Sequence, residues 1–300
     1  MKNFLRKFII FLIVNMAISA IILIYTQSRY VYRQWNSEAH LYGVPKNTVY
    51  DIIILGASHG RVLSSTGNHL RLEEILSKKI LNLSKTSAGV IPAKIYLEYF
   101  YSQGNSTKIV YYIIDPFIFY SSKWNEDNYF LEDEPFKFDF LAVALRQKLS
   151  KEVIINYIRS KFSYFWFVGQ KPVMIKSQDD FLMAINNEAV QKRLQVLYPQ
   201  GISNNNFERY IEILEEIIVL ANKNNNHVVF IFPSTLLGDL PGKEKVLHAL
   251  EAIKQKNNIE IYDFSDAVKD SWYFSDHDHF NTIGVEMFTS RYLKLISDPN

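Results

Sequence analysis

Five short runs of mostly apolar, β-branched or aromatic residues do most to constrain the fold of this chain. They cover residues 49–55, 80–83, 108–114, 227–232 and 259–263. Runs of this length, bounded by turn residues, are typical of parallel strands buried on both faces. Helical stretches are expected between and after them, at residues 70–76, 93–101, 207–221, 243–256 and 282–296. The alternation predicts an α/β fold: a three-layer α/β/α arrangement around a parallel, doubly wound sheet.

The alternation is interrupted between residue 117 and about residue 202. This stretch is rich in Phe, Tyr and Trp and has helical patches at residues 141–149 and 153–162, but no clear buried strand. We therefore expect a helical insertion that forms a cap or an extra layer. The insertion would belong to one domain, residues 48–300, which follows a polar connector at residues 28–47.

The N-terminus carries an apolar run from Phe8 to Tyr25, interrupted only by Asn15 and Ser19. About 18 such residues approach the length that spans the hydrocarbon core of a bilayer. Three cations precede the run (Lys2, Arg6, Lys7), and cytoplasmic flanks favour positive charge. We predict that residues 1–27 form a cytoplasmic tail and an uncleaved membrane anchor, with the bulk of the chain on the other side. A cleaved signal peptide is the alternative.

Composition removes several classes of function. The chain has 300 residues, no cysteine and a formal net charge of +2. Without cysteine there can be no disulfide, no thiol catalysis and no cysteine-ligated metal. No dense block of Lys or Arg suggests a nucleic-acid partner.

Two segments from opposite ends of the chain are expected at the carboxyl ends of strands, where ligands bind in folds of this kind. Ser58 lies in the turn after the first strand, between Gly56 and Gly60. Asp276 and His279 stand three residues apart before the last helix. A serine nucleophile needs a general base, and that base needs an orienting carboxylate. These residues predict a Ser–His–Asp acyl-transfer site.

Each segment also has a structural interpretation. A serine in such a turn can simply cap a helix, and Asp278 or Asn281 can cap the last helix. The side chains of Asp276, His277, Asp278 and His279 could instead bind a metal, although no further ligand is evident elsewhere. His59 is expected at the surface.

The pairing of GASHG after the first strand with DHDHFNTIG before the last helix resembles the SGNH/GDSL hydrolase superfamily. The resemblance implies a flavodoxin-like fold, with Ser58 as nucleophile, His279 as base and then acid, and Asp276 holding the His279 tautomer. It covers the two ends of the soluble region and implies no cofactor and no metal.

The resemblance is less close at the blocks that should supply the oxyanion hole. After the second strand, Gly89 comes later than usual and Ser87 is expected in its place. After the third strand stands Asp115, where an Asn is usual. A carboxylate would repel an oxyanion, so Asp115 is assigned to substrate hydroxyls. Gly56 and Asn281 complete the predicted oxyanion and substrate-binding set.

The anchor and the insertion resemble the membrane-anchored branch of that superfamily, which includes proteins of teichoic-acid D-alanylation and polysaccharide O-acetylation. The resemblance implies a single-pass protein of a bacterial cell membrane that acts outside the cytoplasm. Its activity would be ester hydrolysis or O-acyl transfer on a cell-envelope glycan or polymer, with a membrane-bound acyl donor protein as a partner. The alternative is a non-catalytic assembly or binding protein with a degenerate site.

Overall fold

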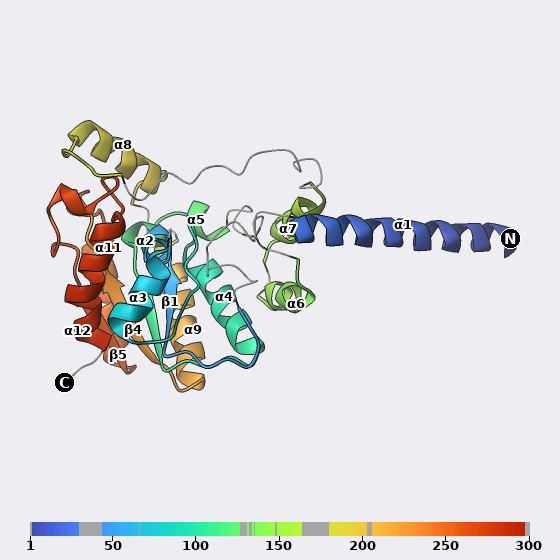
Figure 1. Ribbon diagram of the computed structural model, residues 1–300, viewed down its shortest axis with the longest axis horizontal. Coiled ribbons are helices and arrows are strands. Elements are labelled where there is room, and N and C mark those ends of the chain that lie inside the picture. Colours follow the sequence, from blue (N-terminus) through green and yellow to red (C-terminus); the bar gives the residue numbers. More distant parts are fainter. Residues whose placement is uncertain are drawn as a thin grey trace.

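The core of the protein is a five-stranded sheet in which every neighbouring pair of strands is parallel (Figure 1). The computed structural model describes residues 2–29, 44–65, 67–126, 131, 134, 136–147, 149–163, 180–202 and 206–297. The strands are β1 (Ile52–Gly56), β2 (Ile80–Asn82), β3 (Ile109–Ile113), β4 (His227–Phe232) and β5 (Ile259–Asp263), in the spatial order β2-β1-β3-β4-β5. All five predicted strands are confirmed, within three residues at their ends.

The sheet separates two apolar cores, because successive side chains of a strand point to opposite faces. In β1, Ile53 and Leu55 belong to one core, and Ile52 and Ile54 to the other. Helices α4 (Val90–Ser102), α9 (Phe207–Lys223) and α10 (Lys243–Lys254) contribute to the first core. Helices α3 (Asn68–Leu76), α11 (Thr282–Phe288) and α12 (Lys294–Ser297) contribute to the second. The expected three layers are therefore present.

The last helix is not continuous. A helix was expected over residues 282–296, and the structure divides this span into α11, a π-helical turn η7 (Thr289–Leu293) and α12. The break lies C-terminal to the Asp276–His279 segment and leaves the start of α11 regular.

The segment between β3 and α9 contains only helical elements among its described residues. They are η3 (Pro116–Phe119), α5 (Lys123–Glu126), α6 (Phe138–Arg146), α7 (Lys151–Ser163) and α8 (Asn187–Leu197). Apolar side chains of α6, α7 and α8 join the first core, so these helices add to that side of the sheet. Helix α8 was not predicted. Most of the expected connector, residues 30–43, lies outside the described residues.

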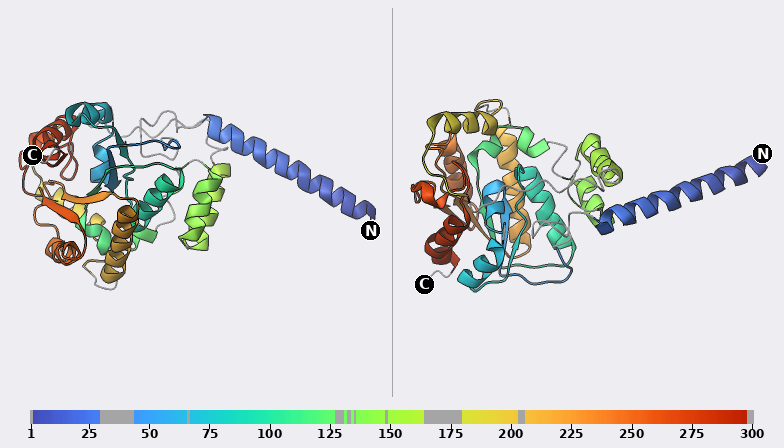
Figure 2. Two further views of the ribbon diagram at one scale, coloured as in Figure 1. Left: turned by 90° about the horizontal axis from the view of Figure 1, so that it is seen from below. Right: turned by 45° about the horizontal axis from the view of Figure 1, so that its top comes forward.

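Helix α1 (Lys2–Arg29) extends away from the rest of the molecule (Figures 1 and 2). Within its segment Lys2–Tyr25, an 18-residue window has a mean hydropathy of 2.7 and is not buried against the rest of the chain. The helix is thus long and apolar enough to cross a membrane. The C-terminal end of α1, which is nearest the sheet domain, packs beside α7.

Candidate active site

A sharp turn carries Ser58 from β1 into the short helix α2 (Ser58–Val62). Gly56 has φ +144°, and a Cβ there would lie 2.6 Å from the carbonyl oxygen of Ile113 in the neighbouring strand. Only glycine allows β1 and β3 to approach so closely before the turn. Ser58 is the first residue of α2 and is half-buried at the carboxyl edge of the sheet.

The Asp276–His279 segment forms the predicted carboxylate–imidazole pair. Asp276 Oδ1 accepts hydrogen bonds from the backbone N–H of Asp278 at 2.7 Å and of His279 at 2.8 Å. Both carboxylate oxygens of Asp276 lie 3.1 Å from His279 Nδ1. Partial burial raises the pKa of Asp276, but the hydrogen bond and charge of His279 outweigh it and hold the pKa at about 2. The aspartate is therefore ionised and fixes the ring of His279.

The other ring nitrogen of His279, Nε2, is buried and has no hydrogen-bond partner in the described part of the chain. A serine hydroxyl on this nitrogen is the contact that a Ser–His–Asp site requires. The structure does not form a Ser58–His279 hydrogen bond. On that side, Asp278 Oδ2 lies 3.9 Å from His279 Nε2. The imidazole is thus oriented by Asp276 at Nδ1 and makes no hydrogen bond at Nε2 among the described residues.

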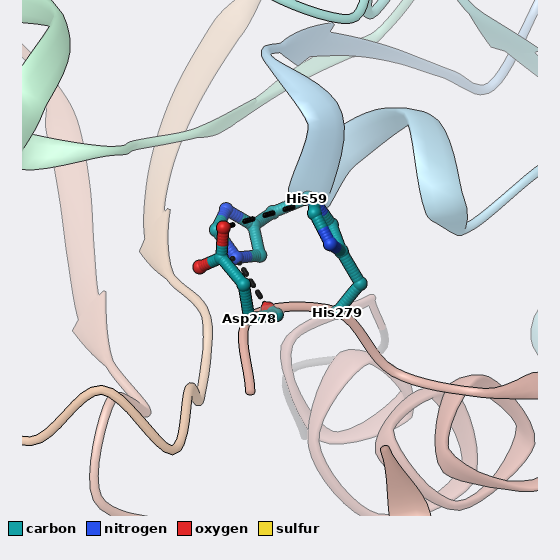
Figure 3. A group of neighbouring side chains, drawn as sticks. All are labelled: His59, Asp278 and His279. Atoms are coloured by element: carbon teal, nitrogen blue, oxygen red, sulfur yellow. Dashed lines mark hydrogen bonds and ion pairs between the residues drawn. The ribbon is translucent and has the colours of Figure 1, made fainter. Parts of the chain in front are cut away.

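His59, the residue after Ser58, is buried rather than at the surface, so that expectation was wrong. Its Nδ1 lies 2.5 Å from Asp115 Oδ1. Its Nε2 lies 2.6 Å from the backbone oxygen of Asp278 and 3.0 Å from Asp278 Oδ1, the latter without hydrogen-bond geometry. The three side chains are at most 3% exposed. Figure 3 shows His59 facing Asp278 across the site.

The electrostatics of this cluster make His59 a cation. Burial lowers its pKa, but the charges and hydrogen bonds of Asp115 and Asp278 outweigh burial and hold it well above the ordinary value of 6.5. Burial raises the pKa of Asp278, yet the charges of His59, His279 and Arg193 bring it well below the usual range. A buried imidazolium therefore joins the turn after β1, the end of β3 and the segment before α11.

Sequence reasoning missed Arg193, which reaches the same cluster from α8. Its Nε donates to Asp278 Oδ2 at 2.7 Å, and its Nη2 lies 2.5 Å from the same oxygen. A second link ties α8 to this segment, because the backbone N–H of Asn186 donates to His277 Nε2 at 2.8 Å. The sequence offered a signal: Asn186 as N-cap, with Val190, Leu194 and Leu197 at helical spacing.

The predicted oxyanion and substrate-binding residues have varied surroundings. Gly89 donates its N–H to the oxygen of Trp124 at 2.6 Å, and Ser87 is exposed with φ +59°. Asn281 caps α11 by accepting from the N–H of Gly284 at 2.8 Å, so its oxygen is engaged in the helix start. These contacts give Gly89 and Asn281 structural roles.

Besides His279 Nε2, the buried polar atoms without a hydrogen-bond partner among the described residues include two that concern the predicted oxyanion blocks. One is Asp115 Oδ2, the oxygen that does not face His59. The other is Ser84 Oγ, just after β2, which lies so close to α2 that it would collide with a Cβ on Gly60. Sequence reasoning passed over Ser84 in favour of Ser87 and Gly89.

The residues that could bind a metal differ from those expected from the sequence. Asp276 and His277 are engaged with His279 and Asn186, whereas His59, Asp278 and His279 each offer a ligand atom, all within 4.8 Å of one another. A metal would need the lone pair of His59 Nε2, which faces a backbone oxygen, and a carboxylate that already pairs with Arg193. The donor set therefore fits a hydrogen-bonded ion cluster better than a metal centre.

No protein-family model matches this chain, and no curated protein matches it.

Proposed function

We propose that this chain is a membrane-anchored serine acyl-esterase or O-acyltransferase of the SGNH type. It acts on a cell-envelope glycan or polymer through an acyl-enzyme at Ser58. Its location is a bacterial cell membrane, with α1 as a single-pass anchor and the sheet domain outside the cytoplasm.

The observation that carries the proposal is the asymmetric environment of His279. One ring nitrogen is held by an ionised aspartate, and the other is buried without a hydrogen bond in the described part of the chain, 3.9 Å from Asp278 Oδ2. The rings of His59 and His279 stack with centroids 5.1 Å apart, which brings the base next to the turn that begins with Ser58. The strand order β2-β1-β3-β4-β5 is the flavodoxin-like order and supports the same assignment.

The reaction follows from these positions. Ser58 Oγ attacks the carbonyl carbon of an ester while its proton passes to His279 Nε2. The tetrahedral intermediate collapses, and the leaving alcohol takes that proton, which leaves an acyl group on Ser58. Water or a glycan hydroxyl then attacks the acyl-enzyme and loses its proton to His279. The second tetrahedral intermediate collapses, the bond to Ser58 Oγ breaks, and His279 returns the proton to Ser58, which is regenerated. Asp276 keeps Nδ1 protonated and stabilises the imidazolium formed in each half-reaction.

The positive charge of His59 offsets the negative charge of Asp115, which would otherwise destabilise the oxyanion. The carboxylate of Asp115 stands where a negative charge would oppose the developing oxyanion. Its ion pair with His59 offsets that charge, and Arg193 does the same for Asp278. His59 and Arg193 are thus positioning residues that hold the two catalytic segments together and balance their acidic neighbours.

A non-catalytic assembly or binding role is the second candidate. The observation in its favour is the missing hydrogen bond between Ser58 and His279. Such contacts are often long in enzymes without substrate and close on binding, so the geometry does not favour this role over catalysis.

Labelling with a fluorophosphonate probe tests the proposal. Full-length protein in detergent would be treated with the probe, digested and analysed by peptide mass spectrometry. We expect modification at Ser58 that is absent from Ser58→Ala and His279→Ala. Ser290→Ala and His248→Ala are matched controls, because both residues lie on exposed helical surfaces, and they should label like wild type.

An unlabelled Ser58 in folded wild-type protein would reject the serine mechanism and favour the binding role. Elemental analysis of the same preparation addresses the metal alternative, because stoichiometric metal lost in Asp278→Asn would replace the serine mechanism with a metal-dependent one.

A further inference from the structure

Helix α7 has two apolar faces, only one of which packs against the domain. Val153 and Tyr157 are buried in the first core. Ile155, Ile158 and Phe162 remain 59%, 36% and 36% exposed. Their spacing places these three side chains along one face of the helix. A row of large apolar side chains at a surface indicates a partner of matching character.

The position of α7 indicates which partner that is. The helix packs beside α1, at the end of α1 that is nearest the sheet domain (Figures 1 and 2). The membrane-spanning candidate ends at Tyr25, and its 24 residues rise about 36 Å, which is slightly more than a hydrocarbon core of about 30 Å. If α1 crosses a bilayer, its C-terminal end and the adjoining α7 lie at the level of the lipid headgroups.

Neighbouring features agree with this location. Helix α6 packs beside α7 and exposes a second apolar row, with Phe138 76% and Leu145 57% exposed. The exposed charged residues of α7 are Lys151, Glu152 and Arg159, which leave a net positive charge on its exposed side. Apolar rows beside cations are typical of helices that lie in the plane of a membrane surface, with the apolar face about 5–10 Å below the headgroups.

We propose that α7 lies on the bilayer surface with Ile155, Ile158 and Phe162 among the lipids, and that α6 lies beside it. The proposal rests on α1 as a membrane-spanning helix and is independent of the chemistry at Ser58. Two attachments, one spanning and one lying on the surface, fix the orientation of the sheet domain relative to the membrane. The active-site edge of the sheet would then be held at a set height, within reach of polymers that are themselves attached to the membrane.

Nitroxide labels on single cysteines test the proposal, and the absence of native cysteine removes background labelling. Full-length Ile155→Cys, Ile158→Cys and Phe162→Cys would be reconstituted in nanodiscs of phosphatidylcholine and phosphatidylglycerol. Power saturation compares collisions with oxygen, which concentrates in lipid, and with a water-soluble nickel chelate. Val219→Cys on α9 is the matched aqueous control, because Val219 is 61% exposed on a helix. Ile13→Cys in α1, 60% exposed, is the lipid control.

We expect the ratio of oxygen to nickel accessibility at the three α7 positions to exceed that at Val219 and to fall below that at Ile13. A ratio equal to that at Val219 would place α7 in water and overturn the proposal. Labels that neither reagent reaches would show that a protein covers this face, which would also overturn it. Either result leaves the labelling of Ser58 unaffected, so the two proposals can fail separately.

Discussion

Two histidines stack on each other at the carboxyl edge of the sheet, and their surroundings differ. His59 has both ring nitrogens engaged, with Asp115 on one side and Asp278 on the other. His279 has one nitrogen held by Asp276, and the other is buried without a hydrogen bond in the described structure, 3.9 Å from Asp278 Oδ2. A histidine whose two nitrogens both face accepting oxygens must donate from both and is a cation. A histidine with one oriented nitrogen and one that makes no hydrogen bond is suited to proton transfer.

The largest effect should come from changing the tautomer of His279. In Asp276→Asn the amide oxygen can still accept the two backbone N–H groups, but the NH₂ group then faces Nδ1. The ring would carry its proton on Nε2 and could no longer accept the proton of Ser58. We expect the rate of Ser58 acylation to fall by about 10⁴-fold with little change in folding. Stopped-flow kinetics with an activated ester would measure the rate, and a decrease below tenfold would contradict the assignment of Asp276.

His59 should matter first for stability. His59→Gln replaces a buried cation between two buried carboxylates with a neutral amide, and uncompensated buried charge costs about 3–5 kcal/mol. We expect the free energy of unfolding in detergent to fall by that amount, as measured by denaturant titration. His248→Gln, at an exposed position on α10, should stay within about 0.5 kcal/mol of wild type. Equal effects of the two substitutions would contradict a structural role for the His59 cluster.

Arg193 should have a smaller effect, because its side chain is 32% exposed and Asp278 retains His59 as a partner. Removing a hydrogen bond to a charged group costs about 1.5–3 kcal/mol. Arg193→Ala should lose stability in this range. Lys192→Ala breaks only an exposed pair with Glu188 on the same helix and should lose about 0.3–0.5 kcal/mol. If Arg193→Ala lowered the free energy of unfolding no more than Lys192→Ala does, the contact of α8 with Asp278 would not stabilise the site.

The pH dependence of stability gives the mildest test. The pKa of His59 is raised on folding, so its stabilisation is complete below the unfolded value of about 6.5 and is lost as the pH rises through the folded value. Between these values the free energy of unfolding should fall by about 1.4 kcal/mol per pH unit. Subtracting the His59→Gln curve from the wild-type curve isolates this contribution. If the free energy of unfolding of wild type relative to His59→Gln increased with pH, the pKa of His59 would not be raised on folding.

The sheet, the position of Ser58 after β1 and the contact between Asp276 and His279 could be predicted because their signals are local. Each strand is a short apolar run between turns, and Asp276 and His279 interact across three residues. A turn after the first strand predicts where Ser58 lies, since the carboxyl ends of parallel strands share one edge. The metal and capping interpretations of the same segment could be compared only with the side chains in place.

The ion cluster could not be predicted, because its partners are far apart in sequence. His59 and Asp278 are separated by 219 residues, and Arg193 lies on a helix between them. A histidine beside a nucleophile has no pattern that distinguishes a surface position from a buried one. His59 can be buried because two carboxylates surround it, one after β3 and one in the segment before α11. Helix α8 was missed because polar residues are interspersed with its apolar positions, Val190, Leu194 and Leu197, so its helical signal is weaker than that of α9.

The most direct test compares the two histidines in one experiment: the rate of fluorophosphonate labelling at Ser58 in His279→Ala and in His59→Gln, alongside the unfolding midpoint of each. We expect His279→Ala to fold like wild type and not to label, whereas His59→Gln should be less stable and should still label below its unfolding midpoint. Labelling of His279→Ala at the wild-type rate would contradict the account, because Nε2 of His279 would then have no part in activating Ser58.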